Sequence, residues 1–228
     1  MKDVNMIVDI QFNSLEYSKQ IYQKSWIDYR MAISMKYTIP CLKGQTMSDF
    51  TVYFYYKDET EPLIREALSD YEPLPPHIQF VPYSTRQELQ NEAARGADKL
   101  YIVRLDSDNM LRKDFFQRVR SAKLEYDTKA IITQHGYLYD SNKHRMAIVS
   151  YHSPSFYTLV YRSADYLSGV RHALKKHHDA IKHKHVLLQD RNFVVVVHGT
   201  NVLNRFKVNR ASELIGQSEI QEILERFC

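Results

Sequence analysis

Hydrophobic and polar positions follow two different periods along the first half of the chain. Short β-branched and aromatic runs predict strands, and segments with apolar residues three or four positions apart predict helices. The predicted strands are residues 5–12, 50–58, 77–83 and 99–108. The predicted helices are residues 15–45, with a break near Pro40 and Gly44, residues 60–71 and residues 84–97. This alternation of strand and helix predicts a largely parallel α/β sheet.

The second half has a less regular pattern. Residues 129–140 and 146–153 predict either a hairpin or two strands of the sheet, and residues 155–163 and 192–201 predict further strands. A helical pattern, broken around Gly169, covers residues 163–184, and residues 211–227 predict an amphipathic C-terminal helix. We therefore expect one α/β domain over residues 1–228, with a Rossmann-like mixed central sheet flanked by helices.

Two aspartates end the fourth predicted strand, in the stretch "RLDSDN" (104–109). In α/β sheets, ligands bind beyond the carboxyl ends of the strands, which is where Asp106 and Asp108 lie. Carboxylates two residues apart on a strand point the same way and stay ionised only if a cation lies between them. Hard oxygen ligands favour Mn²⁺ or Mg²⁺. A capping turn is the alternative, because Asp, Ser and Asn also favour turns.

The stretch 86–116 resembles the segment of GT-A glycosyltransferases in which a helix leads into a central strand closed by an Asp-x-Asp motif. More specifically, the chain resembles a bacterial rhamnosyltransferase family. The resemblance rests on "RLDSDN", "GYLYD" (136–140), "VHGTN" (197–201) and the Gln and Phe of "GQTMSDF" (44–50). It implies a GT-A-like fold and a nucleotide-diphosphate sugar as donor. It does not fix the sugar as rhamnose, and the donor nucleotide (UDP, dTDP or GDP) stays open.

The resemblance also implies roles for residues of the site. Asp106 and Asp108 would hold the metal ion against the donor diphosphate, and His198, after a run of four valines, would be a further metal ligand. The alternative for His198 is a hydrogen-bonded cap at a strand end. Asn201 would hold a phosphate or orient His198.

Sugar transfer with inversion, the outcome we expect, needs a base that deprotonates the acceptor hydroxyl. In the enzymes that the chain resembles, this base is an acidic residue between the Asp-x-Asp motif and the late histidine. Their usual Glu-Asp pair is missing here, and the nearest match is Asp179 in "HHDAI". Asp190 and Asp165 are rivals, and each of these carboxylates could instead be solvated.

Polar residues at other strand ends are candidates for the nucleotide. Gln11, Phe12 and Asn13 follow the first strand and could contact the base, and Asp58 could face the nucleoside. Three arginines are candidates for the charge of the phosphates: Arg86, Arg95 and Arg104. Strand-end polar residues and surface arginines are common, so each of these residues also has a purely structural interpretation. Residues 1–108 would form the nucleotide-sugar half, and residues 109–228 would form the half that binds a hydroxyl acceptor.

Composition narrows the class of protein. Hydrophobic residues make up 44% of the chain and charged residues 25%, which suits a globular core. The net charge of +4 favours an anionic ligand and gives no strong nucleic-acid signal. Cys228 is the last residue, so we expect no disulfide with Cys41 and a reducing compartment. There is no signal-peptide pattern, and no apolar run reaches the ~20 residues of a membrane helix, so we expect a cytoplasmic protein.

Other function classes fit less well. A nucleotidyltransferase would carry a glycine-rich loop after the first strand, where "QFNSLEYS" has none. An aspartate-nucleophile phosphatase would place its Asp-x-Asp motif after the first strand instead of the fourth. A calcium-binding loop starting at Asp106 would need glycine and glutamate where Leu111 and Gln117 stand. A histidine-rich segment (His172, His177, His178, His183 and His185) lacks the spacing of a structural zinc site.

Overall fold

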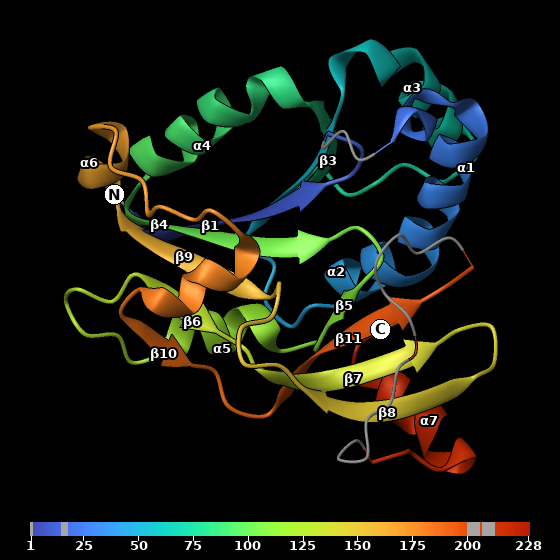
Figure 1. Cartoon of the computed structure of the whole chain (residues 1–228). Helices are drawn as coiled ribbons and strands as arrows, with labels where there is room; N and C mark the ends of the chain where they lie inside the picture. Colours follow the sequence, from blue (N-terminus) through green and yellow to red (C-terminus); the bar gives the residue numbers. More distant parts are fainter. Residues whose placement is uncertain (1, 15–17, 200–205, 207–212) are drawn as a thin grey trace.

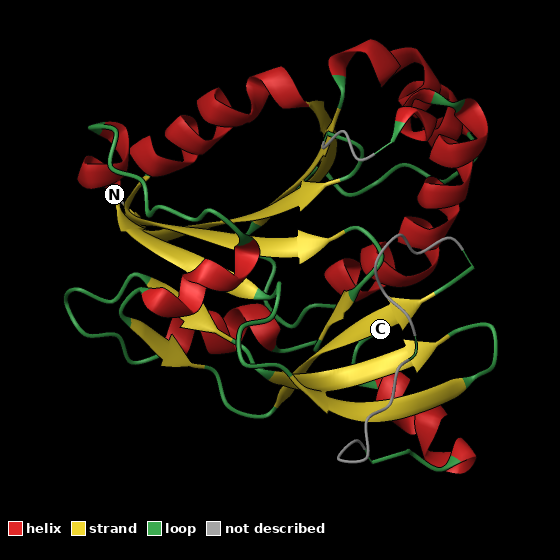
Figure 2. Ribbon diagram, in the orientation of Figure 1, coloured by secondary structure: helices red, strands yellow, loops and turns green. Residues whose placement is uncertain are grey.

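The computed structural model describes residues 2–14, 18–199, 206 and 213–228. It contains two β-sheets with helices packed around them (Figures 1 and 2). The strands are β1 Lys2–Gln11, β2 Thr51–Tyr56, β3 Ile78–Pro82, β4 Ala97–Asp106, β5 Met110–Leu111, β6 Ala130–Ile132, β7 His135–Asp140, β8 Arg145–Ser150, β9 Tyr157–Arg162, β10 His185–Leu187 and β11 Arg191–Val197. The α-helices are α1 Lys24–Ile33, α2 Ile39–Lys43, α3 Glu61–Ser69, α4 Arg86–Arg95, α5 Phe115–Ser121, α6 Ser163–Leu167 and α7 Gln217–Glu225.

The larger sheet has seven strands in the order β10-β6-β9-β4-β1-β2-β3. Strands β4, β1, β2 and β3 run parallel, and β9 is antiparallel to β4. The second sheet has the order β5-β11-β7-β8. The prediction of an α/β fold with a mixed central sheet and flanking helices is confirmed. The register sets Gln11 opposite Asp106, so the carboxyl ends of β1 and β4 meet at one edge of the sheet.

Alternate residues of strand β1 belong to two hydrophobic clusters, so the sheet is covered on both faces. Its even positions, such as Met6 and Val8, join a large core cluster that also contains residues of α1, α3, α5 and the second sheet. Ile7 belongs to a smaller cluster with residues of α4 and α6, and Figure 1 shows these two helices lying together over the sheet. This period of two is what a strand buried on both faces requires.

The first half agrees closely with the predicted elements, except that residues 15–45 are not one helix. In this region the described residues form a 3₁₀ turn (Lys19–Tyr22), α1, a π-helical turn (Ser34–Thr38) and α2. Pro40 lies at the start of α2, where a missing N–H costs little, so it does not end the helical segment.

Of the helical pattern predicted over residues 163–184, the helix before Gly169 and the break at Gly169 are confirmed, but the helix predicted after the break is wrong. Helix α6 ends at Leu167, and Gly169 has a φ of 97°, which an α-helix cannot accommodate. The His172 ring then stacks on Tyr161 with centroids 4.1 Å apart. Only a 3₁₀ turn, His177–Lys182, follows before β10 pairs with β6. Long-range ring stacking and strand pairing override the local helical pattern.

Residues 129–140 form two strands in different sheets. Strand β6 belongs to the larger sheet, and β7 forms a hairpin with β8 in the second sheet. The hairpin explains the Asp of "GYLYD". Asp140 accepts hydrogen bonds from the N–H groups of Asn142 and Lys143, and Arg145 donates to its second oxygen at 2.9 Å. Asp140 therefore stabilises a tight turn.

Gly136, in the same motif, allows strands β7 and β11 to lie close together. A Cβ atom at Gly136 would overlap the carbonyl oxygen and ring of Phe193 on the neighbouring strand. We expect Gly136→Ala to lower the free energy of unfolding by about 1–3 kcal/mol, as overpacking does. Urea unfolding followed by circular dichroism measures this. Gly216→Ala is the matched control, since a Cβ there meets only side-chain ends; equal midpoints for the two variants would contradict a close approach of the two strands at Gly136.

Candidate functional site

The site begins with the turn that follows β4. Asp106 is the last residue of β4, and Ser107, Asp108 and Asn109 lead into β5. Asp108 is only 7% exposed, and Ser107 and Asn109 are fully buried. This turn, residues 106–109, is thus a polar segment that is buried from Ser107 to Asn109, and its buried groups need hydrogen-bond partners.

One face of the segment from α1 to the π-helical turn supplies those partners. Arg30, Ser34 and Thr38 are spaced four residues apart, which places them on a common side of a helical segment. Ser34 Oγ donates to the Ser107 carbonyl oxygen at 2.7 Å, and Thr38 Oγ1 donates to that of Asn109 at 2.9 Å. The Arg30 guanidinium donates from Nη2 to Ser107 Oγ at 2.6 Å. The helical segment and the turn are therefore joined by side chains along their length.

Arg30, Asp108 and His198 form what we call the Asp108 cluster. Arg30 Nη1 donates to Asp108 Oδ2 at 3.0 Å and lies 3.2 Å from His198 Nε2. His198, which follows β11, has its Nε2 3.3 Å from the same carboxylate oxygen. Its other ring nitrogen, Nδ1, is 3.1 Å from the Tyr29 hydroxyl. Residues far apart in the sequence thus meet at the carboxyl edge of the sheet.

The two aspartates have different electrostatic surroundings. Burial favours the protonated form of Asp108, but the hydrogen bond to His198 and the charge of Arg30 outweigh it and hold its pKa below the ordinary value. For Asp106, burial dominates and raises the pKa, with the Asp108 charge adding to the shift and Arg104 opposing it. Arg104 Nη2 lies 2.9 Å from Asp106 Oδ1. Each aspartate is therefore paired with an arginine.

These residues do not fit a divalent metal ion in this arrangement. Asp108 Oδ2 and His198 Nε2 both face Arg30 Nη1, and the Asp106 oxygens face Arg104 and Asn109. A metal ion would need lone pairs from all three predicted ligands directed at one point. Within the described parts of the chain, no group of three or more His, Cys, Asp or Glu is placed to hold a metal ion. Binding through Asp108 and His198 would require Arg30 to withdraw.

The residues at the end of β1 that we predicted to contact the nucleotide base make their contacts within the protein. Gln11 donates to Asp9 Oδ1 at 2.9 Å, and the Phe12 ring is buried in edge contact with Trp26 and Phe80. Asn13 is 2% exposed and bonds the Ile21 carbonyl, the Thr60 hydroxyl and the Lys57 N–H. The Phe12 ring thus has no open face for stacking on a base. Asn201 lies outside the described residues.

Of the other predicted donor-binding residues, Asp58, Arg86 and Arg104 lie near the same edge, whereas Arg95 lies beside the amino end of β4. Asp58 accepts from the Ser84 N–H at 3.2 Å. Arg86 donates from Nε to the buried carboxylate of Asp9 at 2.8 Å, and Arg104 donates to the Ser155 carbonyl in addition to its pair with Asp106. Arg95, at the end of α4, pairs with Glu88 on the surface. Of these cations, only Arg104 contacts an aspartate of the turn.

Asp190, the second candidate base, lies far from His198 along β11. It precedes β11, whereas His198 follows that strand, and seven strand residues at ~3.3 Å each separate them by roughly 20 Å. Asp190 is exposed and pairs with Arg118 at 2.8 Å. It therefore lies at the opposite edge from the Asp108 cluster.

The remaining candidate bases are both bound to cations. Lys182, together with the Lys176 N–H, lowers the pKa of Asp179 to about 2, far from the value near the working pH that suits a general base. Asp165 pairs with Arg162 at 2.7 Å. The assignment of the base to Asp179 stays a prediction that these contacts do not favour.

Sequence reasoning missed Arg30 and Tyr29. The available signal was the spacing of Arg30, Ser34 and Thr38, three polar residues four positions apart in a helical stretch. The Gln and Phe of "GQTMSDF" have packing roles instead. Gln45 Nε2 donates to the carbonyls of Cys41 and Arg112, and the Phe50 ring lies 4.2 Å from that of Phe116.

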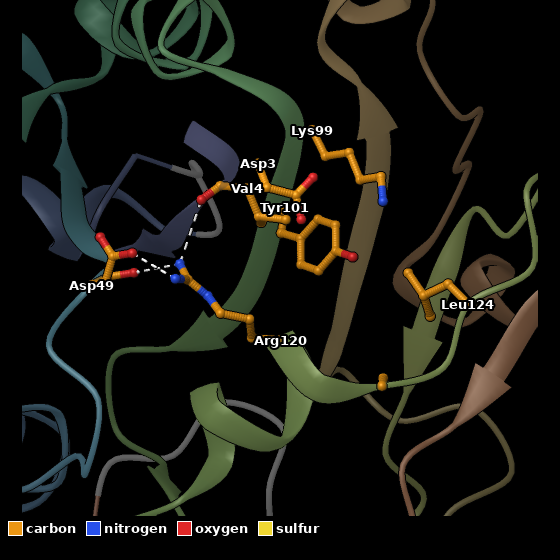
Figure 3. Close-up of a pocket in the computed structure, with 8 residues that line it drawn as sticks. Asp3, Val4, Asp49, Lys99, Tyr101, Arg120 and Leu124 are labelled. Atoms are coloured by element: carbon orange, nitrogen blue, oxygen red, sulfur yellow. Dashed lines mark hydrogen bonds and ion pairs between the residues drawn. The ribbon is translucent and has the colours of Figure 1, made fainter. Parts of the chain in front are cut away.

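A separate cavity of about 260 Å³ lies at the other end of the strands. Figure 3 shows Arg120 pointing to Asp49 and the Val4 carbonyl, and Asp3 and Lys99 also line this cavity. Asp3 and Lys99 are near the amino ends of β1 and β4. The cavity is thus remote from the Asp108 cluster, and the functional site is defined by the cluster itself.

Comparison with known proteins assigns the sequence to a family. Residues 9–210 match the family described as "putative rhamnosyl transferase". The match covers most of the chain, and the protein therefore belongs to this family of glycosyltransferases. No curated protein sequence matches the chain significantly. Within the described residues, no helix is both long and apolar enough to cross a membrane.

Several solved structures are similar in fold. S. aureus TarS 1–349 in complex with UDP has a TM-score of 0.41 and 15% identity, over 86% of this chain and 60% of that one. Its complex with UDP-GlcNAc has a TM-score of 0.43 and 14% identity, over 87% and 60%. The 4-diphosphocytidyl-2C-methyl-D-erythritol synthase of Anaerococcus prevotii has a TM-score of 0.35 and 10% identity, over 84% of this chain and 87% of that one. The chain spans about 60% of the length of these TarS structures.

Proposed function

We propose that the protein transfers a sugar from a nucleotide-diphosphate sugar to a hydroxyl group of an acceptor. Family membership over residues 9–210 supports the class of reaction. The observation that carries the proposal is the Asp108 cluster: a half-buried arginine with a buried aspartate and histidine at the carboxyl edge of a parallel sheet. This edge is where ligands bind in α/β folds.

The chemistry of the transfer explains why charge at this point matters. As the bond to the sugar breaks, negative charge develops on the leaving diphosphate, and fixed cations stabilise it best in a site that excludes water. The sugar passes through an oxocarbenium-like state and is attacked by the acceptor hydroxyl. We expect inversion at the anomeric carbon. Arg30 and Arg104 lie beside the turn that would receive the diphosphate.

The predicted dependence on Mn²⁺ or Mg²⁺ is not part of the proposal, because Arg30 faces the atoms that would bind the ion. The division into a donor half (residues 1–108) and an acceptor half (residues 109–228) is retained only in outline. Arg30 belongs to the first half and His198 to the second, yet both contact Asp108. The donor subsite would therefore draw on both halves.

A thermal-shift panel tests the function. UDP-, dTDP- and GDP-sugars would each be added with Mn²⁺ and with EDTA. A ligand at about 100 times its Kd stabilises by ~2.7 kcal/mol, which raises the Tm of a chain of this size by several degrees. We expect one nucleotide to give this shift, and the same sugar nucleotide to release its nucleoside diphosphate when an acceptor is present. No shift with any donor in either condition would contradict the proposal.

A further inference from the structure

We propose that Arg30 is the cation that binds the donor diphosphate, so that donor binding needs no divalent metal ion. This inference rests on the proposed function and concerns the same site. It assigns a binding role to a residue that the sequence motifs do not include. Three features of Arg30 support it: how it is held, what it faces, and how many donors it has.

Arg30 is built into the site. Its side chain is 14% exposed, which is unusual for arginine unless the residue is paired. Ser34 and Thr38, on the same face of the helical segment, fix the backbone to the turn through buried hydrogen bonds. The guanidinium carbon lies 5.8 Å from the Trp26 ring centroid. The π-helical turn that follows is a feature often found at functional sites. Little ordering would be needed when a ligand binds.

Arg30 holds the position that a metal ion would otherwise occupy. Its Nη1 atom lies 3.0 Å from Asp108 Oδ2 and 3.2 Å from His198 Nε2, and these two atoms are 3.3 Å apart. Withdrawing Arg30 would leave Asp108 buried without its charge partner, which is costly. The aspartate thus serves to position the guanidinium.

The guanidinium has donors to spare for a phosphate. Arginine carries five N–H groups, and the contacts of Arg30 direct some of them at Asp108, His198 and Ser107. The Nε atom is buried and has no hydrogen-bond partner among the described residues. A planar guanidinium matches phosphate oxygens in a bidentate manner. Arg104, beside Asp106, is a second cation at the same edge.

Binding of free nucleoside diphosphates tests the inference with a probe inside the site. Trp26 is the only tryptophan of the chain, and its ring lies against Arg30, so its fluorescence should respond to ligand binding there. UDP, dTDP and GDP would be titrated in EDTA and in Mn²⁺, with calorimetry as a second readout. The variants are Arg30→Gln and Asp108→Asn. Arg65→Gln is the matched control, because Arg65 is 77% exposed on α3.

The inference predicts opposite effects for the two site variants. One diphosphate should bind in EDTA, with a Kd that Mn²⁺ changes less than about threefold. Arg30→Gln should weaken this binding roughly tenfold or more, as loss of a charged hydrogen bond does. Asp108→Asn should tighten it, since the asparagine oxygen can still accept from Arg30 and hold it in place while the competing negative charge is removed. If Arg30→Gln fails to fold, the double variant Arg30→Gln/Asp108→Asn removes both buried charges and should show the same weakening.

Three results would overturn the inference. Binding that requires Mn²⁺ and is abolished in Asp108→Asn would assign the charge to a metal ion. Binding in EDTA that is equal in wild type and Arg30→Gln would place the diphosphate elsewhere. In both cases the proposed function survives, because a nucleoside diphosphate still binds. If none of the three binds in EDTA or Mn²⁺, the inference and the proposed function are both contradicted.

Discussion

Replacing Asn109 with alanine is expected to lower the rate of sugar transfer by roughly 100-fold, the effect of misplacing reacting groups by about 1 Å. The Asn109 side chain accepts a hydrogen bond from the Val196 N–H at 3.0 Å and donates to Asp106 at 3.4 Å. It therefore fixes the turn to β11, two residues before His198. Alanine removes both contacts while leaving Arg30, Asp108 and His198 present.

The measurement is the rate of nucleoside diphosphate release with the donor identified by the thermal-shift panel. Circular dichroism would confirm that Asn109→Ala is folded, with a stability loss of about 1–3 kcal/mol for a buried hydrogen bond. Asn142→Ala is the matched control, because Asn142 is an exposed asparagine in the β7–β8 turn. A folded Asn109→Ala variant that transfers sugar as fast as Asn142→Ala would show that the link to β11 does not position the site.

Asp9→Ala is expected to lower the free energy of unfolding by about 3 kcal/mol, the low end of the cost of breaking a buried ion pair. Asp9 is 5% exposed, and its carboxylate accepts hydrogen bonds from Arg86, Gln90 and Gln11, all between 2.8 and 2.9 Å. Gln90, on the buried face of α4, accepts from the Tyr166 hydroxyl. Alanine would leave the Arg86 charge uncompensated against the sheet.

Thermal unfolding would detect this loss as a fall in Tm of roughly 6–12 °C for a chain of this length. Asp3→Ala is the control, because Asp3 lies on the same strand and is exposed. A fall in Tm that is equal for the two variants would mean that the network around Asp9 adds no stability of its own. The same result would also mean that the pair with Asp9 does not account for the position of Arg86.

The predicted fold was accurate where local pattern and tertiary packing agree. Strands β1 to β4 and the helices between them have periods that match their burial, so residue type alone was sufficient. The segment 163–184 failed because its helical pattern competes with the stacking of His172 on Tyr161 and with pairing of β10 to β6. Contacts made across the molecule decide such a segment, and they cannot be seen from neighbouring residues.

The site was predicted in part for a similar reason. The turn 106–109 and His198 stand at the ends of strong strands, and strand ends mark the ligand edge of an α/β sheet. Arg30 lies within a helix, where an arginine usually faces water, so its spacing with Ser34 and Thr38 did not by itself indicate that it contacts Asp108. Phe12 was assigned to the nucleotide by its place after β1, but whether a ring is open depends on Trp26 and Phe80, which only the fold brings near.

The distance along the chain between Arg30 and His198, 168 residues, has a consequence for synthesis. A ribosome delivers the N-terminal part of a protein first, and that part begins to fold while the rest is still being made. Arg30 and the turn 106–109 leave the ribosome well before β11 exists. Asp108 would then have Arg30 as its first partner in the nascent chain, and the histidine would complete the cluster only when translation is nearly over.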